Sequence, residues 1–290
     1  MLLFDLSGIV TQSCINLHQK SKHEVTVDVV RHVAFSSLLY YKKRFSNKFG
    51  KPIICADSKP YWREGVFEFY KKNRDAARDK SGIDWEAFSA NFKEVQKDID
   101  TYTPYPFIKV RRTEADDSIA ILTQRAHAQR EKIMIVSSDK DMLQLQDKYT
   151  GVQQYSPNRK RMLSAKDKDY GLLTHMVKGD TSDGIPNIFS PEDILMFPGT
   201  GLRQKSVSQK MLDEVHSLVD PFEWDMLDDD SRYKLKRNMR LIDTDMIPER
   251  IETWVLDKYE SELAKNKKNN MQACVIKYKL RNLIQSVQDF

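Results

Sequence analysis

Short apolar runs alternate with longer amphipathic stretches through the first half of the chain. The runs at Leu2–Leu6, in PIICAD (52–57) and at 133–138 are continuous, which is typical of strands buried on both faces. Residues 27–45 place apolar side chains at helical spacing, which predicts an amphipathic helix. Two further strands are expected at 107–110 and 152–155. Strands that alternate with helices predict an α/β fold with a mainly parallel central sheet flanked by helices.

A helix is expected from Glu114 to about Gln129, with Thr113 as its N-cap. Beyond residue 155 the pattern becomes helical and rich in turns. FPGTGLRQKSVSQKML (197–212) reads as glycines that open a basic helix, and a last helix is expected from Met271 to about Ile284. The sequence therefore predicts an α/β domain over 1–187 and a helical region over 188–290.

The segment 61–102 mixes aromatic and basic side chains and shows no strand-like alternation. We interpret it as helical but loosely packed. Single-stranded nucleic acid is bound by such surfaces, because rings stack on bases and cations meet phosphates. The alternative is a helix pair that packs its rings on the core, and we favour this for Phe67 and Phe69. The candidate contacts to nucleic acid are Arg63, Tyr70, Lys72 and Arg78.

Composition restricts the class of protein. The 290 residues are 40% hydrophobic, which excludes general disorder and allows a substantial core. Three cysteines far apart form neither a disulfide framework nor a CxxC metal site, so a reducing compartment fits. The N-terminus lacks the basic leader of a signal peptide, and no segment is long enough to span a membrane. We expect a cytoplasmic protein.

The net charge of +5 says little by itself, since 42 acids accompany the bases. The positions of the bases are more informative, because they cluster in YKKNRDAARDK (70–80), NRKRM (158–162), RYKLKRNMR (232–240) and KNKK (265–268). Gathered on one side, they would attract a polyanion. Each cluster alone is more often a solvated surface.

Acidic residues follow the predicted strands or lie in adjoining turns. The carboxyl ends of parallel strands meet at one edge of a sheet, where ligands bind. Carboxylates without nearby cysteine or histidine favour Mg²⁺ or Mn²⁺ over zinc. Their number suits two ions with outer acids that hold water. The candidates are Asp5, Asp57, Glu114, Asp116, Asp117, Asp139, Asp141, Asp180 and Asp183.

Two such ions would suit hydrolysis of a phosphodiester. Metals about 4 Å apart can clamp both the attacking and the leaving oxygen of an in-line displacement. A cationic side chain is also needed to stabilise charge on the transferring phosphate, and Lys71 or Arg74 can supply it.

Five blocks resemble the signature motifs of the flap endonuclease and 5′ nuclease superfamily, most closely its T-even bacteriophage ribonuclease H branch. The blocks are ADSKPYWR, YKKNR, RRTEADDSIA, VSSDKDMLQL and KGDTSDGIPN. The resemblance implies a PIN-like fold with a helical arch over about 61–102. It also implies a structure-specific 5′ to 3′ nuclease that removes RNA primers and 5′ flaps during lagging-strand synthesis.

The resemblance assigns roles to the candidate residues. It implies a first Mg²⁺ site, with Mn²⁺ able to replace Mg²⁺, and a second site that Asp139 also approaches. Lys71 would be the catalytic lysine, with Arg74 assisting. The first site would comprise Asp5, Asp57, Glu114, Asp116 and Asp139 with Asp117 close by, and the second Asp141, Asp180 and Asp183.

The resemblance also implies a helix-three-turn-helix-like motif that grips duplex DNA and holds K⁺. Its matching residues here are Gly199, Gly201, Arg203 and Lys205. This chain departs from the family pattern, because IFSPEDILMF (188–197) separates the motif from GDTSDGIPN. The expected partners are DNA and RNA:DNA hybrids with 5′ flaps or nicks, a sliding clamp and a single-strand-binding protein, for a monomer in the host cytoplasm.

Two other functions were considered. A non-catalytic junction-binding protein of the same fold would not need its carboxylates, yet every one is present. A phosphatase of the haloacid-dehalogenase type needs a second acid two residues after Asp5, where this chain reads DLS. The sequence therefore favours the nuclease.

Overall fold

The computed structural model describes residues 1–21, 24–165, 171–196 and 201–290. The chain forms two compact units. The first comprises Met1–Lys59, Ile83–Ser164 and Pro248–Phe290, and the second Pro60–Gly82 and Ala165–Ile247. The division at residue 187 expected from the sequence stays a prediction.

A six-stranded sheet forms the centre of the first unit, in the order β3-β2-β1-β4-β5-β6. All neighbouring pairs are parallel except β5 with β6. The mainly parallel sheet predicted from the apolar runs is therefore confirmed, with an added antiparallel edge strand. The strands are β1 (Leu2–Asp5), β2 (Pro52–Cys55), β3 (Phe107–Ile108), β4 (Ile133–Val136), β5 (Val152–Ser156) and β6 (Arg161–Leu163).

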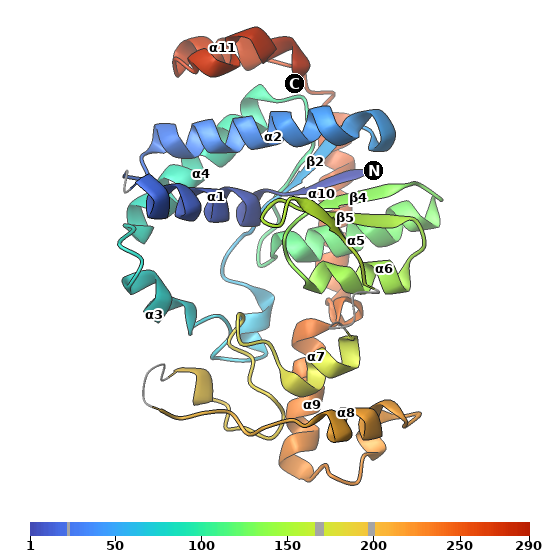
Figure 1. Cartoon of the computed structure of the whole chain (residues 1–290). Helices are drawn as coiled ribbons and strands as arrows, with labels where there is room; N and C mark the ends of the chain where they lie inside the picture. The colour runs from blue at the N-terminus through green and yellow to red at the C-terminus, as the bar shows by residue number, and fades with distance from the viewer. Residues whose placement is uncertain (22–23, 166–170, 197–200) are drawn as a thin grey trace. The chain divides into compact units, whose positions relative to one another are not determined.

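Helices cover both faces of this sheet, with α2 and α5 on opposite sides (Figure 1). Leu2 and Phe4 of β1 join the core under α2, and Leu3 between them faces the side of α5 because strand side chains alternate. The helices are α1 (Leu6–Ser21), α2 (Val27–Phe49), α4 (Trp85–Tyr102), α5 (Ala115–Ala128), α6 (Gln144–Lys148), α10 (Glu249–Ala264) and α11 (Met271–Lys277).

Helix α4 corrects the prediction of loose packing over 61–102. Its Phe88, Phe92, Val95 and Ile99 are buried in the main core, so only the part of this segment before residue 83 lies outside the first unit. Arg31 of α2 fixes α4 further, since its guanidinium bonds Asp98 at 2.9 Å.

The cap of α5 also differs from the prediction. The N-cap is Glu114, whose side chain accepts from the Asp117 backbone while Asp117 Oδ2 accepts from the Glu114 N–H at 3.0 Å. The Thr113 hydroxyl instead donates to the carbonyl of Val110 at 2.8 Å. A reciprocal capping box satisfies two helix-end donors, which is why Glu114 displaces Thr113.

The second unit is small and mainly helical. It contains η1 (Trp62–Gly65), α3 (Arg74–Asp79), α7 (Leu172–Lys178), α8 (Gln209–His216) and α9 (Asp229–Ile242). Asp228 caps α9, since its side chain accepts from the Ser231 N–H at 2.8 Å. The helix expected directly after the glycines is wrong, because α8 begins only after its N-cap Ser208.

The last helix is also shorter than predicted. Helix α11 ends at Lys277, and a 3₁₀ helix, η6 (Arg281–Asp289), follows. Lys279 between them adopts φ +53°, a left-handed conformation that interrupts a right-handed helix. Within the described parts of the chain, no helix is both long and apolar enough to cross a membrane.

Candidate active site

Three strand ends bring carboxylates together in the first unit. Strand β1 lies between β2 and β4, so Asp5 at its end is flanked by the segments that carry Asp57 and Asp139. The strands that follow β1 in the sequence, β2 and β3, lie on one side of it, whereas β4 and β5 lie on the other. The order of strands therefore reverses at β1 and β4, and ligands bind at such switch points in α/β sheets. The predicted convergence of these acids is thus built into the strand order.

Two short hydrogen bonds hold the Asp5 carboxylate. The Ser137 hydroxyl donates to Oδ2 at 2.8 Å, and the Gly8 backbone N–H donates to Oδ1 at 2.8 Å. Asp5 is only 6% exposed. Ser137 also accepts from the Asp139 N–H at 3.1 Å, so one hydroxyl links the first and last of the three strand ends.

Burial and neighbouring like charges both raise the pKa of Asp5. Burial, and next the charge of Asp57, raise the pKa of Asp5 from 3.8 to about 7, with a smaller contribution from Asp139. The hydrogen bonds from Gly8 and Ser137 act in the opposite direction. A carboxylate that resists ionisation beside two others is a place where a cation would be stabilised.

The start of α5 adds more acids beside Asp57. The Ala115 N–H donates to Asp57 Oδ1 at 2.8 Å, which fixes the helix terminus against the end of β2. Glu114 and Asp117 are both buried in the capping box at this terminus. Asp116 lies near the end of β2 as well, because burial, then Asp5 and Asp116, raise the pKa of the Cys55 thiol.

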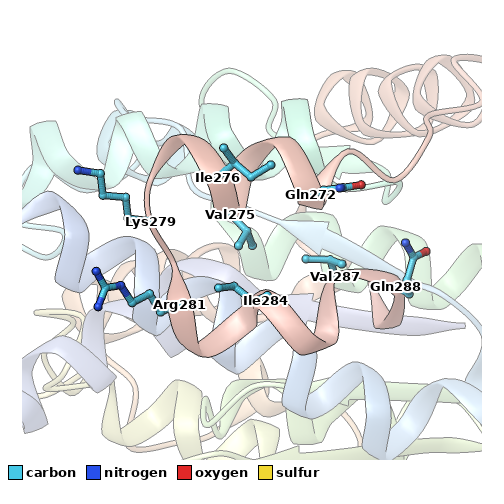
Figure 2. A pocket seen from close by; sticks show the side chains of 8 residues that line it. All are labelled: Gln272, Val275, Ile276, Lys279, Arg281, Ile284, Val287 and Gln288. Carbon is cyan, nitrogen blue, oxygen red and sulfur yellow. The ribbon is translucent and has the colours of Figure 1, made fainter.

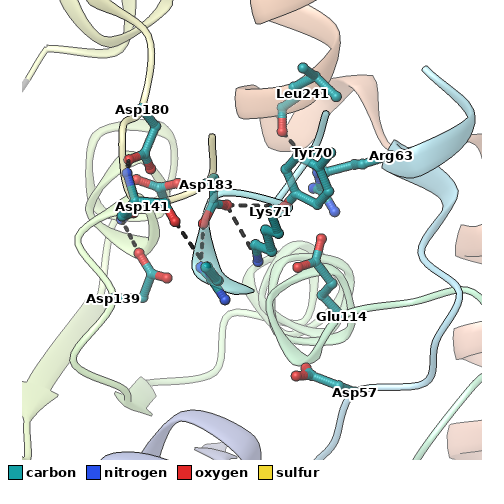
Figure 3. A network of polar contacts seen from close by, with 12 residues as sticks. Asp57, Arg63, Tyr70, Lys71, Glu114, Asp139, Asp141, Asp180, Asp183 and Leu241 are labelled. Carbon is teal, nitrogen blue, oxygen red and sulfur yellow. Dashed lines mark hydrogen bonds and ion pairs between the residues drawn. The ribbon is translucent and has the colours of Figure 1, made fainter. Parts of the chain in front are cut away.

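The loop after β4 carries Asp139 and Asp141, and Figure 3 shows the bond between them. The Asp141 N–H donates to Asp139 Oδ1 at 2.8 Å. Gln154 of β5 supports the loop, since its side-chain amide donates to the Asp139 carbonyl at 2.5 Å and to the Ser137 carbonyl at 3.0 Å. The sequence reasoning missed Ser137 and Gln154. The two adjacent glutamines in the predicted strand VQQY were the available signal.

These residues fit a hard divalent cation. The donors at the three strand ends and at α5 are carboxylate oxygens, which Mg²⁺ and Mn²⁺ prefer. Burial is the largest cause of the raised pKa of Asp5, and the charges of Asp57 and Asp139 raise this pKa further. The set in the first unit comprises Asp5, Asp57, Glu114, Asp116, Asp117, Asp139 and Asp141.

The Asp5 pKa predicts a pH-dependent stability in metal-free protein. The folded pKa lies above the unfolded one, so the stability contributed by protonated Asp5 is present below pH 3.8 and lost as the pH rises through about 7. Asp5→Asn has no charge to ionise. In EDTA it should melt a few degrees above the parent at pH 8, since about 1 kcal/mol moves Tm by roughly 2–4 °C.

This gap should narrow toward pH 5, where the parent carboxyl is protonated. The control is Asp147→Asn on an exposed position of α6, which should show no pH-dependent gap. A gap of equal size at both pH values would show that charge on Asp5 does not destabilise the fold.

In the second unit, Asp183 holds the YKKNR segment. Figure 3 shows Tyr70 and Lys71 turned toward this carboxylate. The Tyr70 hydroxyl donates to Oδ2 at 3.0 Å, Lys71 Nζ lies 3.3 Å from the same oxygen, and the Arg74 guanidinium pairs with Oδ1. The Lys71 N–H also donates to the Asp183 carbonyl at 2.7 Å. Three predicted functional side chains thus share one acid.

Two residues that the sequence reasoning missed shape this contact. The Asn73 amide donates to the carbonyl of Thr181 at 2.6 Å. Gly184 adopts φ +72°, and a Cβ there would meet the Asn73 side chain at 2.9 Å and the Phe69 carbonyl at 3.0 Å. Glycine therefore permits the close approach of the two backbones.

Asp180 starts the same loop. Burial raises the pKa of Asp180, but hydrogen bonds from His175 and Ser182 outweigh it and lower the pKa to about 2. His175, which the sequence reasoning did not single out, lies 3.5 Å from the carboxylate. Asp180 and Asp183 belong to the second unit, so their meeting with the acids of the first unit stays a prediction.

The candidate contacts to single-stranded nucleic acid differ in exposure. Arg63 is 6% exposed and donates to the Leu241 carbonyl at 2.8 Å, and Tyr70 is 4% exposed, which favours packing roles for both. Lys72 is exposed, and Arg78 pairs with Asp75 on α3. Phe67 is buried, in agreement with the packing interpretation. Binding of nucleic acid by any of these residues stays a prediction.

Hydrogen bonds join residues 187 and 190 to residues 204 and 205, on either side of the part of the chain that the structure does not describe. Asn187 donates from its backbone to the Gln204 side chain at 2.7 Å and from its amide to the Lys205 carbonyl at 2.7 Å. The Lys205 N–H donates to Ser190 at 2.8 Å. These bonds place Gln204 and Lys205 next to Asn187, the last residue of the GDTSDGIPN block.

The structure describes three of the four residues expected to contact duplex DNA. Arg203 and Lys205 are exposed, and Gly201 has φ +81°. Gly199 lies outside the described residues. The K⁺ site and the helix-three-turn-helix-like motif stay predictions.

The fold and the acidic strand ends define a nuclease of the 5′ to 3′ exonuclease type. The family model described as "5′-3′ exonuclease, N-terminal resolvase-like domain" matches residues 1–171, and the model "T4 RNase H, C terminal" matches residues 167–290. The chain belongs to the 5′-3′ exonuclease family and is a hydrolytic enzyme.

Relatives support this assignment. Ribonuclease H of Enterobacteria phage T4 is 30% identical over 265 residues, which cover 89% of this chain and 86% of the phage protein. A 5′-3′ exonuclease of Buchnera aphidicola is 30% identical over 142 residues, 47% of either chain. The solved bacteriophage T5 flap endonuclease, a complex with DNA and metal ions, shares the fold. Its TM-score is 0.63 at 17% identity, over 92% of this chain and 99% of that one.

Proposed function

We propose that this nuclease is structure-specific and Mg²⁺-dependent, and that it hydrolyses phosphodiesters of RNA primers in RNA:DNA hybrids and of DNA at 5′ ends or flaps during lagging-strand replication. The observation that carries the proposal is the carboxylate cluster at the ends of β1, β2 and β4, where burial and the nearby charges of Asp57 and Asp139 raise the pKa of Asp5. Further support comes from the similarity to a phage ribonuclease H over most of its length.

The cofactor is proposed to be two Mg²⁺ ions, with Mn²⁺ able to replace them. The first would be held by Asp5, Asp57, Glu114, Asp116 and Asp139, with Asp117 orienting Glu114 through the capping box. Asp141, Asp180 and Asp183 are proposed for the second. When bound, such ions activate water and stabilise the leaving oxygen of an in-line displacement.

The chain's own side chains have separable roles in this proposal. Ser137 and Gly8 keep the Asp5 carboxylate in one orientation through their hydrogen bonds. Lys71 and Arg74 bring positive charge to the phosphate under attack, which stabilises the extra negative charge of the transition state. Asp183 pairs with both Lys71 and Arg74, which holds these two side chains in place before substrate binds.

The nucleic-acid contacts remain part of the proposal. Lys72 and Arg78 would meet the phosphates of a single-stranded 5′ end, and Arg203 and Lys205 those of the duplex, with K⁺ near Gly201. A sliding clamp and a single-strand-binding protein are the proposed replication partners of a monomer acting in the host cytoplasm.

The substrate assignment can be tested with two matched duplexes. One carries a nick followed by a 5′ RNA segment, and the other carries a 5′ DNA flap of the same sequence, both labelled at the 5′ end. We expect Mg²⁺-dependent release of labelled 5′ products from both and none in EDTA, because cleavage depends on the carboxylate cluster.

Cleavage of only one duplex would restrict the substrate class to that one. Binding of both duplexes without cleavage of either would contradict the nuclease proposal and favour the junction-binding alternative. A 3′-labelled copy of each duplex, read on the same gel, distinguishes attack from the 5′ end from attack elsewhere.

A further inference from the structure

The C-terminal helices α11 and η6 present apolar side chains in two opposite directions. On the inner side, Val275 and Leu283 are 5% and 3% exposed and belong to the main core. On the outer side, Ile276 is 71% exposed and Ile284 is 55% exposed. A helix pair that only covered a core would carry polar residues on its outer side, so the outer isoleucines need another explanation.

These outer side chains line a groove of about 500 Å³ between α11 and η6. Ile276, Ile284 and Val287 form its apolar middle, and Val275, which is buried in the core, borders it from the inner side (Figure 2). The same view places Lys279 and Arg281 at one end and the amides Gln272 and Gln288 at the other. Single exposed apolar residues are ordinary, whereas a grouped set inside a groove is typical of a binding surface.

The turn between α11 and η6 fixes the position of the groove end that carries Lys279 and Arg281. Lys279 is held at φ +53°, the Leu280 N–H donates to the Val275 carbonyl at 3.1 Å, and the Arg281 N–H donates to the Lys279 carbonyl at 2.8 Å. No acidic residue lines the groove. Within the described parts of the chain, neither Lys279 nor Arg281 forms an ion pair. The groove thus offers two uncompensated positive charges beside an apolar floor.

We propose that this groove binds a short acidic peptide segment of another protein, with apolar side chains between its carboxylates. The apolar side chains would pack between Ile276 and Ile284, and the carboxylates would meet Lys279 and Arg281. The amides of Gln272 and Gln288 can bond the peptide backbone at the other end. This binding function is separate from hydrolysis and depends on none of the acidic residues of the first unit.

Other occupants match the groove less well. Its floor contains no aromatic ring on which a base could stack, and two cations neutralise few phosphates, so single-stranded nucleic acid is disfavoured. A second copy bound through the same groove would bring four cations and no acidic lining residue to the interface, because a two-fold interface uses the same patch on both subunits. A peptide with both acidic and apolar side chains matches the positive charge and the apolar floor of the groove.

The test measures fluorescence anisotropy of a labelled peptide in which leucines alternate with aspartates, added to the full chain. We expect saturable binding that weakens with salt, since the rim contacts are ionic. Ile284→Ser and the double variant Lys279→Glu with Arg281→Glu should each weaken binding at least about tenfold, which corresponds to 1.4 kcal/mol. Because all three side chains are exposed, the melting temperature should not change.

Matched control variants lie elsewhere on the same unit. Leu263→Ser removes an exposed apolar side chain of α10, and Lys268→Glu reverses an exposed charge beyond it. Neither should change the affinity for the peptide. Control peptides with leucine replaced by serine, or aspartate by asparagine, should bind at least about tenfold more weakly.

Several results would overturn the proposal. These are no saturation up to about 1 mM peptide, equal losses in the groove and control variants, or equal binding of the neutral peptide. If Ile284→Ser lowers the melting temperature, Ile276→Ser decides the same question from the other helix. Displacement of the peptide by a single-stranded DNA oligomer whose binding also depends on Lys279 and Arg281 would reassign the groove to nucleic acid.

Discussion

Replacing Asp139 by asparagine is expected to slow cleavage of a 5′-flap substrate about 100-fold or more, because the carboxylate lost is a proposed direct metal ligand and even indirect supports of metal sites are worth 10–100-fold. The fold should survive. Asparagine keeps an oxygen that accepts from the Asp141 N–H, which Asp139 Oδ1 does at 2.8 Å. The loss of rate would therefore report the loss of charge.

Asp147→Asn is the matched control, since it removes the same charge from an exposed position on the neighbouring helix α6. Its rate should equal that of the parent. Single-turnover rates with a 5′-labelled flap give the comparison. Similar rates for Asp139→Asn and the parent would remove Asp139 from the metal-binding set.

Replacing Lys71 by alanine is expected to lower the single-turnover rate about 100-fold, the scale on which one preorganised electrostatic contact acts in a transition state. Affinity for the flap duplex should change little. Lys71 is mostly buried and is held over the rings of Tyr61 and Tyr70 and against Asp183, a placement that suits one directed contact rather than general attraction.

The neighbour Lys72 provides the contrast. It is exposed and lies over the ring of Phe69, so Lys72→Ala should weaken binding and make it less sensitive to salt while the rate at saturation stays near that of the parent. Rates and dissociation constants for both variants separate the two roles. Equal losses of rate and affinity in Lys71→Ala would show that this lysine contributes to substrate binding and not specifically to the transition state.

The contacts of Tyr70, Lys71 and Arg74 with Asp183 bear on whether this carboxylate can bind a metal ion. The two oxygens of this carboxylate already accept from Tyr70 and pair with Lys71 and Arg74. A cation bound at Asp183 would compete with these side chains. In the proposed two-ion arrangement, an ion at Asp183 would release Lys71 and Arg74 toward the phosphate, so the positions of these two side chains would be coupled to metal binding.

The parallel sheet and its acidic ends were predictable because both follow from local sequence. Continuous apolar runs identify strands buried on both faces, and an acid directly after such a run must lie at the carboxyl edge. Asp5, Asp57 and Asp139 were located in this way. Their order across the sheet, with β1 in the middle, was not predictable, since strand order depends on packing of distant segments.

Thr113 and Glu114 are both able to cap a helix. The hydrogen bonds that decided between them are local, since Glu114 bonds with Asp117 and Thr113 with Val110, each three residues away. Other features had no local signal. The contact of Tyr70 with Asp183 joins residues 113 apart. The left-handed Lys279 that ends α11 is equally hidden, because lysine rarely adopts that conformation and its sequence neighbours are ordinary helix formers.

The central claim is that the carboxylates at the strand ends bind the divalent cation that drives cleavage from the 5′ end. Its most direct test is the single-turnover rate on a 5′-labelled flap across a Mg²⁺ titration, for the parent and for Asp139→Asn. We predict no cleavage by the parent in EDTA, a rate that rises to saturation with Mg²⁺, and a variant curve that is flat or displaced to at least about tenfold higher Mg²⁺. Equal rates in EDTA and Mg²⁺, or superimposable curves for the two proteins, would contradict the claim.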